Sequence, residues 1–269
     1  MGFRTTSASM FLVLGLVGCG GNLHSGFVAQ VERSDCRFDA EYEVSVAASA
    51  TDQLVLSAGA GGLTVEGREG LDQVRATAWT CASDTDYLDE LEVTLDREGD
   101  NVVLKTHYPD LSGFRMGNNV ARIDLVVEVP LGMGVEIEDS SGSMEVSGTG
   151  TLRIDDSSGS ITVRGISGAV SIDDSSGGLE VEDVIGDVEI DDGSGSIEVG
   201  NIQGTLRLRD NSGSIDVIDV SRDVVVERDG SGSITFRDVG GNFTVRRDGS
   251  GGIHYTNVEG SVQIPKGKS

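Results

Sequence analysis

The stretch Asp156-Ser-Ser-Gly-Ser-Ile-Thr-Val163 recurs, with small changes, seven times in the C-terminal half of the chain. The glycine at its centre has seven equivalents, spaced by 17, 18, 18, 18, 19 and 19 residues: Gly142, Gly159, Gly177, Gly195, Gly213, Gly232 and Gly251. Self-similarity at a nearly constant period of this length is the signature of a stacked repeat protein.

Each copy carries apolar residues at fixed offsets. Ile161 and Val163 flank the polar Thr162, and a second pair, Val170 and Ile172, follows before the next glycine of the repeat, Gly177. This alternation predicts two short strands per repeat, each with one inward face. One coil cannot bury that face alone, so equivalent strands must stack in parallel. We therefore predict an all-β, single-domain parallel β-solenoid (β-helix) with two-strand coils of about 18 residues over residues 132–266.

The last coils have 19 residues and contain the aromatic residues Phe236, Phe243 and Tyr255. We expect a slightly wider interior at this end of the stack. Pro265 and Lys266 follow the last apolar pair, and they are expected to shield the open sheet edge from end-to-end association.

Residues 38–131 are rich in alternating segments but lack the regular period, so we predict an irregular β-rich part that caps the solenoid. Gly61-Gly-Leu-Thr-Val65 echoes a later coil, which suggests that irregular coils begin there. Residues 84–90 fit either a short helix or a loop. Residues 107–119 are expected to form an excursion from the β structure.

The N-terminus has the pattern of an export signal. Arg4 precedes an apolar run over residues 10–17, which is too short to span a bilayer. The run ends in Leu16-Val-Gly-Cys19, which resembles the lipobox of bacterial lipoproteins. That resemblance implies a lipoprotein signal peptide over residues 1–18, lipid attachment at Cys19 and a flexible tether over residues 19–37. The alternative is an ordinary secretory signal with an incidental cysteine.

The residues after Cys19 bear on location. Gly20 and Gly21 stand where an aspartate would favour retention in the inner membrane, so the resemblance favours a lipid anchor in the outer membrane of the cell envelope.

Two cysteines remain, Cys36 and Cys81. An even pair in an exported chain indicates a disulfide, and two free buried thiols are the alternative.

Composition excludes several classes of function. The chain of 269 residues has 45 acidic and 20 basic residues, and a net charge of −25 gives it no attraction for nucleic acid. Its three histidines are scattered and form no zinc pattern with cysteine. The minimal turns leave no evident cleft, which argues against a polysaccharide-active β-helix enzyme. We therefore expect a protein that is not an enzyme.

Stacking would align an aspartate from every coil into one acidic line: Asp139, Asp156, Asp174, Asp192, Asp210, Asp229 and Asp248. Like charges about 4.8 Å apart repel, so the line must be relieved. One explanation is that each carboxylate accepts backbone N–H groups of its own turn. The other is calcium, a weakly bound cofactor held by three pairs of neighbours: Asp155 with Asp156, Asp173 with Asp174, and Asp191 with Asp192.

The β-rich lead-in, the segment Val127-Glu-Val-Pro-Leu-Gly132 and the serial Ser-Gly-Ser-Ile-x-Val coils together resemble the bacterial "putative adhesin" family of unknown function, which is related to head-GIN-type domains. The resemblance covers about residues 38–265. It implies the solenoid architecture and supplies no catalytic residues.

These observations favour a non-catalytic cell-envelope lipoprotein with an adhesin-like, structural or interaction role. It would be held at the membrane by its lipid anchor and would present a repetitive acidic surface to a glycan or an envelope protein. The alternative is a periplasmic accessory or sensor module that acts through a protein partner.

Overall fold

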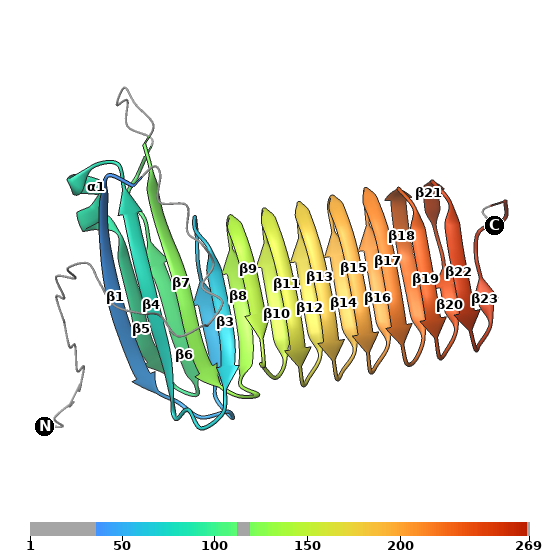
Figure 1. Ribbon diagram of the computed structural model, residues 1–269, viewed down its shortest axis with the longest axis horizontal. Helices are drawn as coiled ribbons and strands as arrows, with labels where there is room; N and C mark the ends of the chain where they lie inside the picture. The colour runs from blue at the N-terminus through green and yellow to red at the C-terminus, as the bar shows by residue number, and fades with distance from the viewer. Residues whose placement is uncertain (1–35, 112–118, 268–269) are drawn as a thin grey trace, which may run out of the picture.

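The computed structural model describes residues 36–111 and 119–267, which form two long sheets facing each other along a stack of coils (Figure 1). The predicted signal peptide and Cys19 lie outside the described residues, as does most of the predicted excursion. Within the described part, no helix has the length and apolar character needed to cross a membrane.

Each regular coil gives one strand to each sheet, and all neighbouring coil strands are parallel. The 11-stranded sheet receives β9 (Gly142–Ser147), β11 (Gly159–Ile166), β13 (Gly177–Val184), β15 (Gly195–Ile202), β17 (Gly213–Val220), β19 (Ile234–Val239) and β22 (Ile253–Val258). The 12-stranded sheet receives β8 (Gly134–Asp139), β10 (Leu152–Asp156), β12 (Val170–Asp174), β14 (Val188–Asp192), β16 (Leu206–Asp210), β18 (Val224–Ser231), β20 (Phe243–Val245) and β23 (Val262–Gln263), and β21 (Asp248–Ser250) pairs with β18. The predicted parallel solenoid is confirmed.

The interior is a continuous apolar column. Ile161, Leu179 and Ile197 occupy the same register position in successive coils and are buried. Every coil repeats this arrangement, so each inward side chain packs on its equivalents above and below. Burial between coils is therefore what stabilises strands that are too short to be stable alone.

Two further coils precede the regular ones, and their order in space differs from their order in the chain. They are β2 (Gln53–Ser57) with β3 (Leu63–Arg68), and β6 (Asn101–His107) with β7 (Ala121–Pro130). The β2–β3 coil lies between the β6–β7 coil and the β8–β9 coil, because β2 pairs with β6 and β8 while β3 pairs with β7 and β9. The coil suggested by Gly61-Gly-Leu-Thr-Val65 therefore exists, but its neighbour in the sequence is not its neighbour in space.

Antiparallel strands complete the N-terminal end of both sheets (Figure 1). In one sheet, β1 (Phe38–Ala47) pairs with β4 (Gln73–Ala82), which pairs with β7; in the other, β5 (Glu92–Glu98) pairs with β6. Between β4 and β5 the chain forms the helix α1 (Thr85–Glu90), whose first turn is capped by a hydrogen bond of 3.0 Å from the Asp86 amide to Asp84 Oδ1. This decides between the helix and the loop that the sequence allowed.

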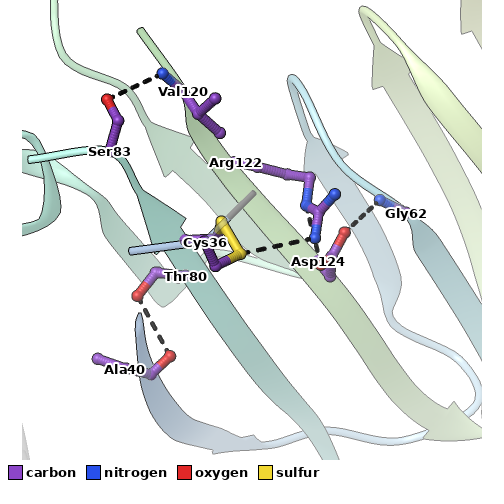
Figure 2. Close-up of a disulfide and its surroundings, with 9 residues drawn as sticks. Cys36, Ala40, Gly62, Thr80, Ser83, Val120, Arg122 and Asp124 are labelled. Carbon is purple, nitrogen blue, oxygen red and sulfur yellow. Dashed lines mark hydrogen bonds and ion pairs between the residues drawn. A yellow bond between two sulfur atoms is a disulfide. The ribbon is translucent and has the colours of Figure 1, made fainter. Parts of the chain in front are cut away.

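A disulfide joins Cys36 to Cys81, with a Cα–Cα distance of 5.3 Å (Figure 2). It ties the residues before β1 to the end of β4. Beside it, Arg122 forms an ion pair of 3.2 Å with Asp124, which also accepts a hydrogen bond of 2.8 Å from the amide of Gly62. The predicted disulfide is confirmed, and the alternative of two free thiols is wrong.

The extra residue of the 19-residue coils is taken up in the wall of the solenoid. Leu208 is opposite Val226 and Arg209 is opposite Arg228, so Glu227 forms a bulge in β18. Its carboxylate pairs with Arg207 on one neighbouring strand and lies 2.9 Å from Arg246 Nη1 on the other side. The added residue therefore lies in a bulge braced by two arginines, and the wider interior expected from the sequence stays a prediction.

Candidate functional site

The recurring Asp-x-Ser-Gly turn places one aspartate per coil at a corner of the solenoid. Strand register aligns these residues into what we call the aspartate column: Asp139, Asp156, Asp174, Asp192, Asp210, Asp229 and Asp248. The first six are at most 6% exposed. The acidic surface expected from the sequence therefore does not include this column, which faces the interior.

Strand alternation explains this burial. Leu152, Ile154 and Asp156 are buried along β10, while Asp155 between the last two is exposed. Side chains at successive positions leave opposite faces of a strand, so the aspartate continues the apolar inner face.

The same alternation separates the paired aspartates that the sequence offered as calcium ligands. Asp155 and Asp156 point to opposite sides of β10, and Asp173 and Asp174 do the same in β12, as do Asp191 and Asp192 in β14. The structure therefore does not bring these pairs together as ligands of one ion. Nor do three or more His, Cys, Asp or Glu residues in the described part of the chain form a group that could hold a metal.

The turns satisfy one oxygen of the central aspartates. The amides of Ser176, Ser194 and Ser212 donate to Oδ1 of Asp174, Asp192 and Asp210 at 3.1, 3.2 and 2.9 Å. This is the turn chemistry predicted from the sequence. In contrast, Oδ2 of Asp174 and Oδ2 of Asp192 are buried and have no hydrogen-bond partner among the described residues.

Burial, together with repulsion from neighbouring carboxylates, raises the pKa of several aspartates in the column. Burial, followed by the charges of Asp210 and Asp174, raises the pKa of Asp192 to about 6. Burial also raises the pKa of Asp139 to about 6. For Asp229, burial comes first, and the neighbouring carboxyl groups of Asp248 and Asp210 help to raise the pKa to about 7. The column is thus electrostatically unlike an ordinary set of surface aspartates.

A second column, of glycines, fixes how closely the coils approach at this corner. The seven glycines of the repeat have φ between 131° and 153°. A Cβ on Gly195 would lie 1.5 Å from the carbonyl oxygen of Gly177, and the other six would meet a backbone oxygen at 1.4–1.8 Å. Only glycine fits this glycine column, because both the backbone angle and the space exclude a side chain.

A third row of equivalent residues, which was not predicted from the sequence, lies at the other corner of each coil. Non-glycine residues adopt a left-handed conformation there, with φ between 51° and 59°: Asp183, Asn201, Asp219, Asp238 and Asn257. Asn201 Nδ2 donates to Asp183 Oδ1 at 2.6 Å, and Asn257 donates to Asp238 at 2.8 Å. The signal was present in the repeat, because this position holds only Asp, Asn or glycine, the residues that tolerate such angles.

The outer face of the 12-stranded sheet carries an unbroken row of charged side chains. Four carboxylates in register form what we call the acidic row: Glu138, Asp155, Asp173 and Asp191. The row then changes sign at Arg209 and Arg228. Arg209 lies 3.6 Å from Asp191 and 3.2 Å from Glu189, so its positive charge ends the run of negative charge in the acidic row.

The outer face of the 11-stranded sheet has a comparable but interrupted row: Glu145, Thr162, Glu180, Glu198, Asp216, Thr235 and His254.

Charge is also uneven along the chain. Nine acidic and nine basic residues cancel over residues 200–269, so the whole net charge of −25 arises from residues 1–199.

Hollows also lie on the surface of the described residues. One of about 380 Å³ is lined by residues 48–50, 68–72 and 130–131, at the ends of β3 and β7. The other, of about 250 Å³, is lined by Ser57, Ala58, Ser140 and three carboxylates, two of which, Glu138 and Asp155, belong to the acidic row. The acidic row therefore begins at a polar hollow.

Comparison with known families decides the identity of this fold. The family model described as Toastrack DUF4097 matches residues 63–268. The chain belongs to this family. The match begins at β3 and includes the strands up to β7 as well as the regular coils, so the Toastrack unit contains the irregular coils too. The resemblance to the adhesin-like family inferred from the sequence is confirmed.

Comparison with solved structures finds similarity to this chain at low sequence identity. A "putative adhesin" from Bacteroides fragilis is 12% identical, with a TM-score of 0.52, over 85% of this chain and 98% of that one. A "putative lipid binding protein" from Parabacteroides distasonis is 19% identical, with a TM-score of 0.45, over 80% of this chain and 96% of that one. No curated protein sequence matches the chain.

Proposed function

We propose that this Toastrack protein is a non-catalytic, adhesin-like protein of the cell envelope that binds a repetitive glycan through its outer surface. The observation that carries the proposal is the acidic row, in which equivalent carboxylates stand in register on successive coils. The description of the Bacteroides fragilis structure as a "putative adhesin" supports the same role.

The chemistry of the row favours a neutral polysaccharide. Ionised carboxylates accept hydrogen bonds and donate none, which suits the hydroxyl groups of sugars. The acceptors recur about every 4.8 Å, the spacing of strands in a sheet. An acidic glycan would be repelled by a chain with a net charge of −25.

Attachment to the membrane through Cys19 is part of the proposal. Replacing Cys19 with alanine is expected to move the protein from the membrane fraction to the soluble envelope fraction, because the acyl chains supply the anchoring free energy. Fractionation, together with metabolic labelling by a fatty acid, measures this. If the Cys19→Ala protein stayed in the membrane fraction to the same extent, the anchor would have to be elsewhere.

The glycan partner is tested by binding neutral and acidic envelope polysaccharides to the protein without its predicted signal peptide. The triple variant Asp155→Asn/Asp173→Asn/Asp191→Asn is expected to bind a neutral glycan at least about tenfold more weakly, because it removes the charged acceptors of the row. The matched control, Glu145→Gln/Glu180→Gln/Glu198→Gln, removes the same charge from the other sheet and should change affinity by less than about threefold. Equal weakening by both variants, or no binding to any glycan, would contradict the proposal.

A further inference from the structure

The aspartate column is a buried line of acidic groups that is not part of the proposed glycan-binding surface. Parallel register puts one carboxyl in each coil, about 4.8 Å from the next. Asp156, Asp174 and Asp192 are at most 2% exposed. Ionised carboxylates at this spacing and burial repel each other and also lose their hydration.

Within residues 36–111 and 119–267, no arginine or lysine forms an ion pair with Asp156, Asp174 or Asp192 at the centre of the column. The charged groups that act on Asp192 are Asp210 and Asp174, one coil away on each side, and the groups of its own turn are the amides of Gly193 and Ser194. The nearest arginine in register, Arg209, stands on the outer face of the same sheet and pairs there with Glu189 and Asp191.

The buried carboxylate oxygens that accept no hydrogen bond suggest what neutralises the negative charge of the aspartate column. Oδ1 of Asp192 is held by the Ser194 amide, while its buried Oδ2 accepts no hydrogen bond from any described residue. A protonated carboxyl has an O–H donor as well as acceptors, so one proton can join two stacked carboxyl groups. Such a bond both removes a charge and satisfies a buried oxygen.

We propose that the aspartate column is a proton-binding site, in which stacked carboxyl groups share protons along the axis of the solenoid near neutral pH. The raised pKa values of Asp139, Asp192 and Asp229 agree with this arrangement. The site depends only on the fold and is independent of the proposed glycan surface.

The sign of the pH effect follows from the direction of these shifts. A carboxyl whose pKa is higher in the folded state than in the unfolded chain binds more protons when folded. Its stabilising contribution is complete below the unfolded pKa of about 4 and is lost as the pH rises through about 6 to 7. The protein should therefore become more stable as the pH falls from 8 to 5.

The test is thermal unfolding of the protein and two variants between pH 8 and pH 5. We expect the Tm of the unaltered protein to rise by at least about 5 °C over this range. Asp192→Asn should raise the Tm at pH 8 by about 3 °C or more and reduce its dependence on pH, because the amide can donate to a neighbouring carboxylate at every pH. Glu198→Gln removes the same charge from the exposed face of β15 in the other sheet and should leave the pH dependence unchanged.

Two results would overturn the proposal. One is a Tm that does not rise as the pH falls, or an equal response of the Asp192→Asn and Glu198→Gln variants, which would reflect overall charge alone. The other is stabilisation at pH 8 by millimolar Ca²⁺ that EDTA reverses and that Asp192→Asn abolishes, because the column would then be neutralised by a metal ion.

Discussion

Replacing Gly195 with alanine is expected to destabilise the solenoid by roughly 3–6 kcal/mol, because the substitution combines backbone strain with overlap of buried atoms. Gly195 has φ of 152°, and its added Cβ would lie 1.5 Å from the carbonyl oxygen of Gly177. The neighbouring backbone could move away only by opening the parallel strand pairing between β13 and β15. We expect the coils around the substitution to lose their order, seen as a lower Tm and a lower denaturant midpoint.

The chain supplies a matched control one position after an equivalent glycine. Gly178 lies next to Gly177, has no positive φ, and its added Cβ would come no closer than 3.7 Å to the Ser196 hydroxyl. Other coils carry serine at this position, as at Ser160. Gly178→Ala should therefore change stability by less than about 0.5 kcal/mol. Similar losses in both variants would show that the glycine column does not set the spacing of the coils.

The second large effect is expected at the aromatic end of the core. Phe243 has no exposed surface, and its ring centroid lies 4.6 Å from that of Phe236 and 5.8 Å from that of Tyr255. Phe243→Ala should cost about 3–5 kcal/mol, because it removes a buried ring and leaves a cavity between coils that cannot collapse without losing strand pairing. Denaturant unfolding followed by circular dichroism measures this loss.

A control at an exposed apolar residue separates packing from hydrophobicity alone. Ile185 is 59% exposed at a corner, so Ile185→Ala should change stability by less than about 0.5 kcal/mol. Phe243→Leu should recover part of the stability lost in Phe243→Ala, since it refills part of the cavity. A cost below about 1 kcal/mol for Phe243→Ala would mean that the terminal coils contribute little to the fold.

The regular coils could be predicted because their information is local and repeated. Pairs such as Ile161 and Val163 mark an inward face, and their recurrence fixes the parallel register of the next coil. The spacing of the repeat glycines was also visible in the sequence, because no other residue can occupy the corner at which they lie. The family resemblance rested on the same residues.

The orientation of the aspartates was harder to predict, because aspartate is normally a surface residue. Counting alternation from Ile172 through Asp173 to Asp174 places Asp174 inside, whereas the charge of the side chain indicates the surface. The position of the β2–β3 coil could not be predicted at all. Its neighbours come from residues 101–107 and 121–147, and pairing between distant segments leaves no periodic trace in the sequence.

The displaced β2–β3 coil has a consequence for the order in which the protein can assemble. A chain made from its N-terminus produces these two strands early, yet both partners of each strand are synthesised much later. The regular coils need only the preceding repeat, so they can add one at a time once a first pair exists. The N-terminal end must therefore wait for its later-made neighbours, and it is the segment most in need of protection from premature contacts while the chain is incomplete.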